Sequence, residues 1–172
     1  MQRAKKTKRL ALLGICTAFA MVLSYLELLL PPIMSSIPGI KMGLANIAII
    51  FVLYRISVRA AISVSVVRVI LVSLLFGNAM ALAYSIAGAL LSLSVMALLS
   101  RTGAFSCVGV SVAGAVFHNV GQILMAMLLL GTAELGYYLV VLTVSGVIAG
   151  IVIGICGGIL TARIPNKLTA GI

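Results

Sequence analysis

Arg68 is the residue whose type and position most directly suggest chemistry. It lies near the middle of an apolar run, 60–76, that has the length of a membrane-spanning helix. A charged side chain at the centre of a bilayer costs at least about 2.5 to 3.5 kcal/mol on insertion scales. Arg68 is therefore a candidate for solute binding. The alternative is an arginine that packs between helices or extends its charge to the membrane interface.

The only histidine of the chain lies in a second polar stretch, FSCVGVSVAGAVFHNVGQ, at residues 105–122. Residues four apart share a face of a helix, so His118 and Gln122 lie on one stripe and Asn119 lies on the next. We interpret this side as the wall of an intramembrane site, with a cluster of interhelical hydrogen bonds as an equally good alternative. The opposite stripe is expected to face hydrocarbon, and its members are Val108, Val112, Val116, Val120 and Leu124.

Three further polar residues lie near one end of their predicted helices. Glu27 lies near the end of an apolar run at 10–30, and Lys41 and Asn46 lie near the start of a run at 40–54. Together with the arginine and the histidine, they are expected to line one outward-facing cavity. The glutamate has two candidate ion-pair partners, Lys41 and the arginine. Because such a pair leaves surplus positive charge, the site is predicted to take a small anionic or amphipathic solute.

The composition is that of a polytopic membrane protein. Hydrophobic residues make up 63% of the 172 residues and charged residues 8%. With a mean hydropathy of +1.34, these values exclude a soluble domain of this length. The formal net charge of +10 does not indicate nucleic-acid binding, because the basic residues cluster beside apolar runs. The three cysteines have neither disulfide nor metal-ligand spacing.

The basic residues define one side of the predicted bundle. Five lie in the segment 3–9, and the others fall mainly at alternate ends of apolar runs, such as Arg55, Arg101 and Arg163. By the positive-inside rule, a single all-α integral membrane domain over 1–172 is predicted, with six transmembrane helices and both termini cytoplasmic. A cleaved signal peptide is the alternative for the first run, which is longer than a typical signal core. The predicted helices are 10–30, 40–54, 60–76, 79–100, 105–130 and 136–162.

Small residues at helical spacing predict two packing faces. In the 10–30 helix, Gly14 and Ala18 are four residues apart, with Ala11 on the adjoining turn. A longer ridge in the 136–162 helix is predicted to pack inside the protein, because small residues let helices approach closely. It consists of Gly146, Gly150, Gly154 and Gly158.

Catalytic patterns are missing from the sequence. It has no paired carboxylates, no acidic diphosphate-binding motif, no nucleotide-binding loop and no CxxC. With two acidic side chains in the whole chain, metal-dependent diphosphate or ATP chemistry lacks its ligands. We therefore expect neither an enzyme nor an autonomous pump, and neither a metal nor a cofactor.

Four segments in order resemble the bacterial Gx transporter family, which is also labelled heptaprenyl diphosphate synthase component I. They are KMGLANIAIIFVLY (41–54), RVILVSLLFG (68–77), SIAGALLSLSVMALL (85–99) and VSVAGAVFHNVGQ (110–122). The chain also resembles the substrate-binding membrane components, or S components, of energy-coupling factor transporters. This resemblance implies a six-helix protein of the bacterial cytoplasmic membrane that joins a transmembrane coupling subunit and two ATPases.

The resemblance carries two further implications. S components of this kind present small residues on their first helix to the coupling subunit, which makes Ala11, Gly14 and Ala18 the candidate interface. The synthase label implies a different role, that of a membrane accessory in polyprenyl diphosphate or quinone synthesis. Such an accessory is expected to be noncatalytic, because the acidic clusters of a prenyl diphosphate synthase are missing from the sequence.

Overall fold

The computed structural model describes residues 2–29 and 43–165. Within these residues, every element of regular secondary structure is a helix. Five of the helices are long and apolar enough to cross a membrane. The chain is therefore a multi-pass, all-α membrane protein, as the sequence predicts. The helices are α1 (Gln2–Leu29), α2 (Asn46–Arg55), α3 (Val58–Phe76), α4 (Ala79–Thr102), α5 (Cys107–Leu130) and α6 (Tyr138–Arg163), with a short 3₁₀ helix, η1 (Ala133–Tyr137), before α6.

Three helices begin where a polar side chain caps the first turn. The Ser57 hydroxyl accepts a hydrogen bond from the Ala60 amide at the start of α3, and Asn78 does the same for Ala81 at the start of α4. Ser106 caps α5 in this way. Because a cap satisfies an amide that has no partner within the helix, these residues fix the helix starts within a few residues of the predicted positions.

The first two helices differ from their predictions, since α1 begins at Gln2 where the sequence predicts a start at residue 10, and α2 is shorter than predicted. The sequence predicts a helix over 40–54, whereas α2 has 10 residues, Asn46–Arg55, and residues 40–42 lie outside the described part of the chain. A helix of this length extends about 15 Å, half the hydrocarbon thickness of a bilayer. Its middle six residues, 48–53, are all buried. Helix α2 is therefore part of the core of the bundle. With 10 residues it is too short to span a membrane by itself.

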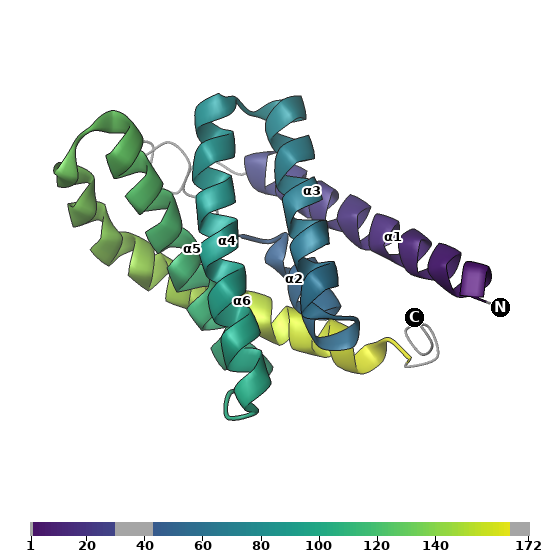
Figure 1. Ribbon diagram of the computed structural model, residues 1–172. Helices are drawn as coiled ribbons and strands as arrows, with labels where there is room; N and C mark the ends of the chain where they lie inside the picture. Colours follow the sequence, from purple (N-terminus) through teal and green to yellow (C-terminus); the bar gives the residue numbers. More distant parts are fainter. Residues whose placement is uncertain (1, 30–42, 166–172) are drawn as a thin grey trace.

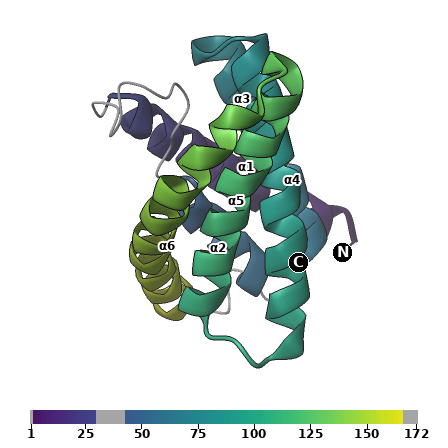
Figure 2. The same ribbon diagram turned by 90° about the vertical axis from the view of Figure 1, so that its left-hand side faces the viewer.

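The long helices surround α2. Figure 1 shows α3 and α4 upright and adjacent, with α1 leaning away from them on one side. In Figure 2, α5 lies between α4 and α6, and these two pairs form the most extensive helix contacts in the molecule. Large apolar side chains such as Leu74, Leu98 and Leu128 are mostly exposed. They give the bundle an outer surface suited to hydrocarbon.

Glycines set the distances between α5 and its neighbours. A Cβ atom on Gly121 would lie 2.8 Å from the carbonyl oxygen of Ala87 in α4, and one on Gly150 of α6 would lie 2.6 Å from the Cα atom of Val112. Val108 lies against α6 in the same way, opposite another glycine. The expectation that the whole valine stripe faces hydrocarbon is therefore wrong at its N-terminal end. There the glycine ridge of α6 covers the stripe.

Candidate functional site

Polar side chains from four long helices converge inside the bundle, next to the start of α2. They line a cavity that is completed by Gly43 and Asn46 and by two valines of α3. Since these helices are far apart in sequence, only the tertiary fold brings the polar groups together. The lining residues are Glu27, Gly43, Asn46, Arg68, Val69, Val72, Ser73, Ser85 and His118.

Arg68 places a positive charge in this cluster. Its Nη1 atom donates to the Ser24 hydroxyl oxygen over 3.3 Å, which links α3 to α1. Its Nε atom is sealed from solvent and has no hydrogen-bond partner among the residues that the structure describes. A buried N–H group without an acceptor costs about 1–3 kcal/mol. Arg68 therefore holds an unused donor at the edge of the cavity.

Glu27 is the only acidic side chain among the described residues that line the cavity. It is 9% exposed, and its carboxylate accepts a hydrogen bond from the backbone amide of Gly43. The negative charge of Glu27 also attracts the positive charge of the Arg68 guanidinium. Because opposite charges offset part of the cost of burial, Glu27 stabilises the buried guanidinium while remaining anchored to the start of α2.

Gly43 is required by the geometry of this anchor. Its φ angle is +78°, in the left-handed region that favours glycine. A Cβ atom on Gly43 would also lie 3.0 Å from the side-chain amide nitrogen of Asn46, Nδ2. A side chain at this position would strain the backbone and displace Asn46, so Gly43 permits the carboxylate and the amide to approach the same cavity wall.

The cavity is small. Its free volume is about 20 Å³, which is enough for one water molecule. Any larger ligand must displace side chains from the cavity walls. The lining provides the means to hold it, since the arginine and serines donate hydrogen bonds, the glutamate accepts them, and the valines offer an apolar surface.

His118 reaches the cavity because α4 has a glycine opposite it. A Cβ atom on Gly88 would lie 2.8 Å from the His118 carbonyl oxygen and 3.0 Å from its Cε1 atom. Gly88 thus allows α5 to approach α4 closely enough for the imidazole to pass between the helices. Gly88 thereby serves the polar site as well as helix packing.

The structure brings four of the seven predicted solute-binding residues together: Glu27, Asn46, Arg68 and His118 all line the cavity. Asn119 turns toward α6, where its amide nitrogen donates to the Leu142 carbonyl oxygen over 2.8 Å. Gln122 is not part of the cavity lining, and its Cγ atom lies against Gly88. The prediction for Lys41 lies outside the described residues.

Three serines of the cluster, Ser24, Ser73 and Ser85, are not among the solute-binding residues predicted from the sequence. Ser24 is 4% exposed, Ser73 8% and Ser85 9%. The available signal was position: Ser24 precedes Glu27 by three residues and therefore shares its helix face. Ser73 gave no comparable signal, since small hydroxyl residues occur throughout these apolar runs.

The predicted packing residues occupy two different environments. Ala11, Gly14 and Ala18 are exposed on α1, and a Cβ atom on Gly14 would meet nothing within 4 Å. On α6, the first three glycines of the ridge lie against α5, whereas Gly158 is in looser contact, with the Cys107 sulfur 3.9 Å from its Cβ position. The three ridge glycines in close contact are Gly146, Gly150 and Gly154.

Comparison with known proteins assigns the family. The family model described as heptaprenyl diphosphate synthase component I matches residues 16–160. The chain belongs to this family. Neither the curated proteins nor the solved structures gave a match.

The match to the heptaprenyl diphosphate synthase component I family covers the whole polar cavity, since its lining residues run from Glu27 to His118. It begins after Ala11 and Gly14. Within residues 2–29 and 43–165, this member of the family has no group of three or more His, Cys, Asp or Glu side chains that could hold a metal ion.

Proposed function

We propose that this protein is the solute-binding membrane subunit of an uptake transporter of the energy-coupling factor kind. The cavity around Arg68 would receive the charged group of a small anionic or amphipathic solute. The observation that carries this proposal is the buried Nε–H of Arg68, which has no acceptor among the described residues. A carboxylate or phosphate oxygen at this position would convert the unused donor into a charge-assisted hydrogen bond.

The surrounding residues suit such a ligand. Glu27 acts on the guanidinium from one side and is held by Gly43, so it offsets the cost of burying the charge without occupying the Nε atom. His118 and the serines provide further hydrogen-bonding groups. Val69 and Val72 would contact the apolar part of an amphipathic solute. Because the cavity holds only one water molecule, solute entry requires the helices around it to move.

Transport also needs a source of energy, and the sequence has no nucleotide-binding loop. We infer that a transmembrane coupling subunit with two ATPases supplies it. The exposed small residues of α1, Ala11, Gly14 and Ala18, are the proposed contact, since close approach of a partner helix requires small side chains. In the proposed topology the basic helix ends face the cytoplasm and the membrane is the bacterial cytoplasmic membrane.

A second function follows from the family description. The family is named for a component of heptaprenyl diphosphate synthase, which favours a noncatalytic membrane accessory that associates with a soluble synthase. The two functions predict different partners, although both use a membrane-embedded protein that binds an anionic or amphipathic molecule.

Copurification from native membranes separates the two. The proposed function predicts that a membrane coupling subunit and ATPases accompany the protein, and that Gly14→Leu with Ala18→Leu removes them. The matched control is Ser94→Leu, which adds bulk at an exposed position of α4 and should leave the complex intact. Recovery of a soluble prenyl synthase without ATPases would replace the transporter proposal with the accessory function.

A further inference from the structure

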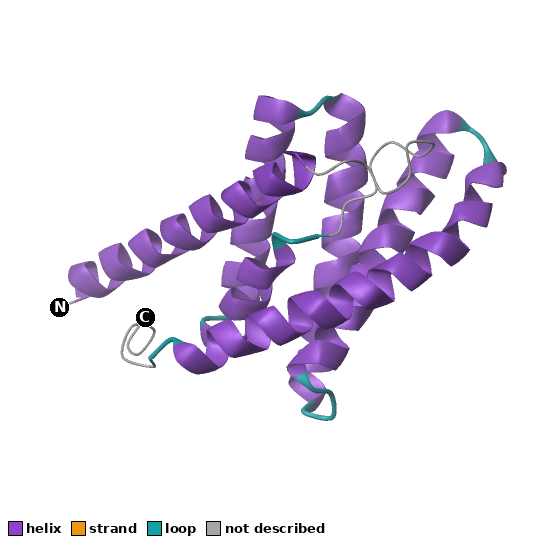
Figure 3. Cartoon of the chain, turned by 180° about the vertical axis from the view of Figure 1, so that it is seen from behind, coloured by secondary structure: helices purple, strands orange, loops and turns teal. Residues whose placement is uncertain are grey.

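An apolar groove lies between α1 and α6. Its lining differs in chemistry from that of the polar cavity. Its walls are wholly apolar and its free volume is about 280 Å³. Figure 3 shows α1 and α6 running in similar directions, with the beginning of α1 and the end of α6 on the same side of the molecule. Residues from all three helices line it, among them Leu12, Ile15, Phe19, Phe51, Leu160 and Ile164.

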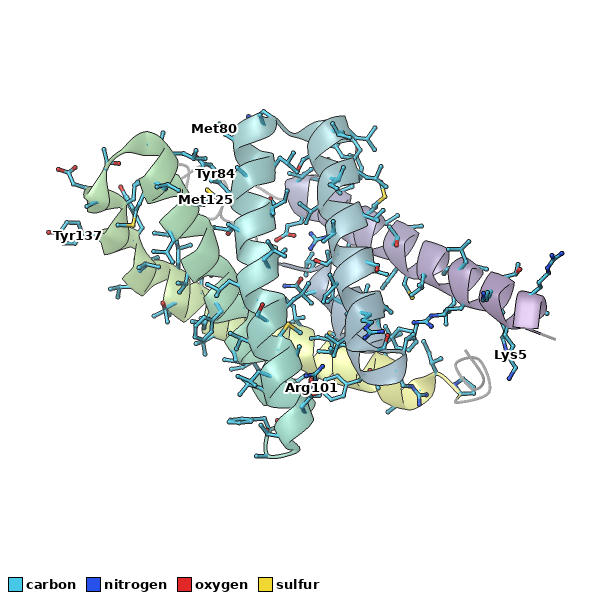
Figure 4. The ribbon with its side chains drawn as sticks, in the orientation of Figure 1. Lys5, Met80, Tyr84, Arg101, Met125 and Tyr137 are labelled. Carbon is cyan, nitrogen blue, oxygen red and sulfur yellow. The ribbon has the colours of Figure 1, made fainter. Side chains whose placement is uncertain are left out.

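The groove-lining stripe of α1 becomes basic at its N-terminal end. Leu12, Ile15 and Phe19 follow a spacing of three and four residues, which keeps side chains on one face of a helix. The same spacing continues backward to Lys8 and Lys5, both exposed. Figure 4 shows Lys5 pointing from the first turns of α1 toward the side on which α6 ends. One helix face therefore carries an apolar part and a cationic part in series.

The opposite wall ends in the same way. Ile164, directly after the end of α6, closes the groove, and the neighbouring Arg163 is exposed. The Arg55 guanidinium, at the end of α2, donates to the Ile164 carbonyl oxygen. The chain's two acidic side chains lie elsewhere, Glu27 in the polar cavity and Glu134 in η1. Each wall of the groove therefore continues into basic residues.

We propose that this groove binds one anionic membrane lipid, with an acyl chain along the apolar walls and the phosphate at Lys5, Lys8 and Arg163. The wholly apolar walls suit an acyl chain. The charge favours an anionic headgroup, because basic residues beside a membrane helix attract anionic lipids. The site is independent of the proposed solute cavity.

Native mass spectrometry of the full-length protein in detergent tests the proposal. Phosphatidylglycerol and phosphatidylcholine with identical acyl chains are added separately. The wild type should retain one phosphatidylglycerol molecule, with a preference of roughly tenfold or more over phosphatidylcholine. Lys5→Gln with Lys8→Gln should remove this preference. Arg3→Gln with Lys6→Gln removes the same charge from the opposite face of α1 and should preserve it.

A second pair of variants tests the apolar part. Ile15→Trp should obstruct the groove and weaken retention of both lipids, whereas Leu10→Trp, on the exposed opposite face, should not. Equal loss of preference in the two lysine and arginine double variants would reduce the effect to general surface charge and overturn the site. Unchanged lipid retention in Ile15→Trp would also overturn it, as would the absence of bound phosphatidylglycerol in the wild type.

Discussion

Arg68 and Ser24 are joined by a hydrogen bond of 3.3 Å from the guanidinium Nη1 to the hydroxyl oxygen, across the interface of α3 and α1. This bond aligns the guanidinium so that its Nε atom remains buried and unpaired among the described residues. The first helix therefore takes part in the polar site through Ser24 as well as through Glu27. Any movement of α1 relative to α3 would change the surroundings of the arginine.

Ser24→Ala should lower the stability of the protein by about 1.5 kcal/mol, because it leaves a second donor of a charged group without a partner. Denaturation of the purified protein in detergent measures this change. Ser63→Ala is the matched control, since Ser63 is an exposed serine of α3 that bonds only within its own helix. In an Arg68→Gln background the effect of Ser24→Ala should largely disappear. An undiminished effect there would show that the bond to Arg68 is not its cause.

Gly88→Ala should destabilise the bundle by about 1–3 kcal/mol. The added Cβ atom would lie 2.8 Å from a backbone oxygen of α5, and a backbone cannot rotate away as a side chain can. Thermal unfolding in detergent is the measurement. Gly14→Ala is the control, because no atom lies within 4 Å of its Cβ position. Similar unfolding temperatures for the two variants would contradict the close packing of α4 on α5.

Asn119→Ala should cost about 1 kcal/mol of stability, the usual contribution of a hydrogen bond between membrane helices. The side-chain amide of Asn119 donates a hydrogen bond to α6, and Asn119 does not line the cavity. Retention of the solute should therefore not change. His118→Ala, one residue away, should weaken retention, because His118 does line the cavity. Mass spectrometry of the small molecules that remain with each purified variant distinguishes the two. Loss of the solute in Asn119→Ala alone would reverse these roles.

The two ends of α5 test the topology. Ala104 precedes the helix and Thr132 follows it, and both are exposed. In a variant whose three native cysteines are replaced by alanine, Thr132→Cys should react with a membrane-impermeant maleimide in intact cells. Ala104→Cys should react only after permeabilisation, because it adjoins the basic Arg101. Labelling of Ala104→Cys in intact cells would contradict the proposed orientation.

The sequence predicted most of the helices and singled out the rare polar residues, for a physical reason. In an apolar chain, each charged or amide side chain is costly to bury, so Glu27, Asn46, Arg68 and His118 stand out by type alone. The starts of several helices could also be predicted from the sequence, because capping residues such as Ser106 act within one helical turn.

The sequence could not predict which neighbour each face of a helix meets. Asn119 is adjacent to His118, yet one residue turns a helix by about 100°, and this rotation places Asn119 against α6. Val112 is aliphatic, and only the position of Gly150 on α6 shows that it is covered. The length of α2 was also inaccessible, since Ile47 to Leu53 is apolar whether a helix is buried in protein or in lipid.

The central claim is that Arg68 binds the charged group of the solute. The most direct test compares the small molecules retained by purified wild-type protein, Arg68→Gln and Arg59→Gln, quantified by mass spectrometry after folding is verified. Arg59 is an exposed arginine of the same helix, so its variant removes equal charge outside the cavity. Loss of a charge-assisted hydrogen bond, about 1.5–3 kcal/mol, predicts a roughly tenfold or greater fall in retention of an anionic solute for Arg68→Gln, and none for Arg59→Gln. Wild-type retention in Arg68→Gln would contradict the account and make Arg68 a helix-packing residue.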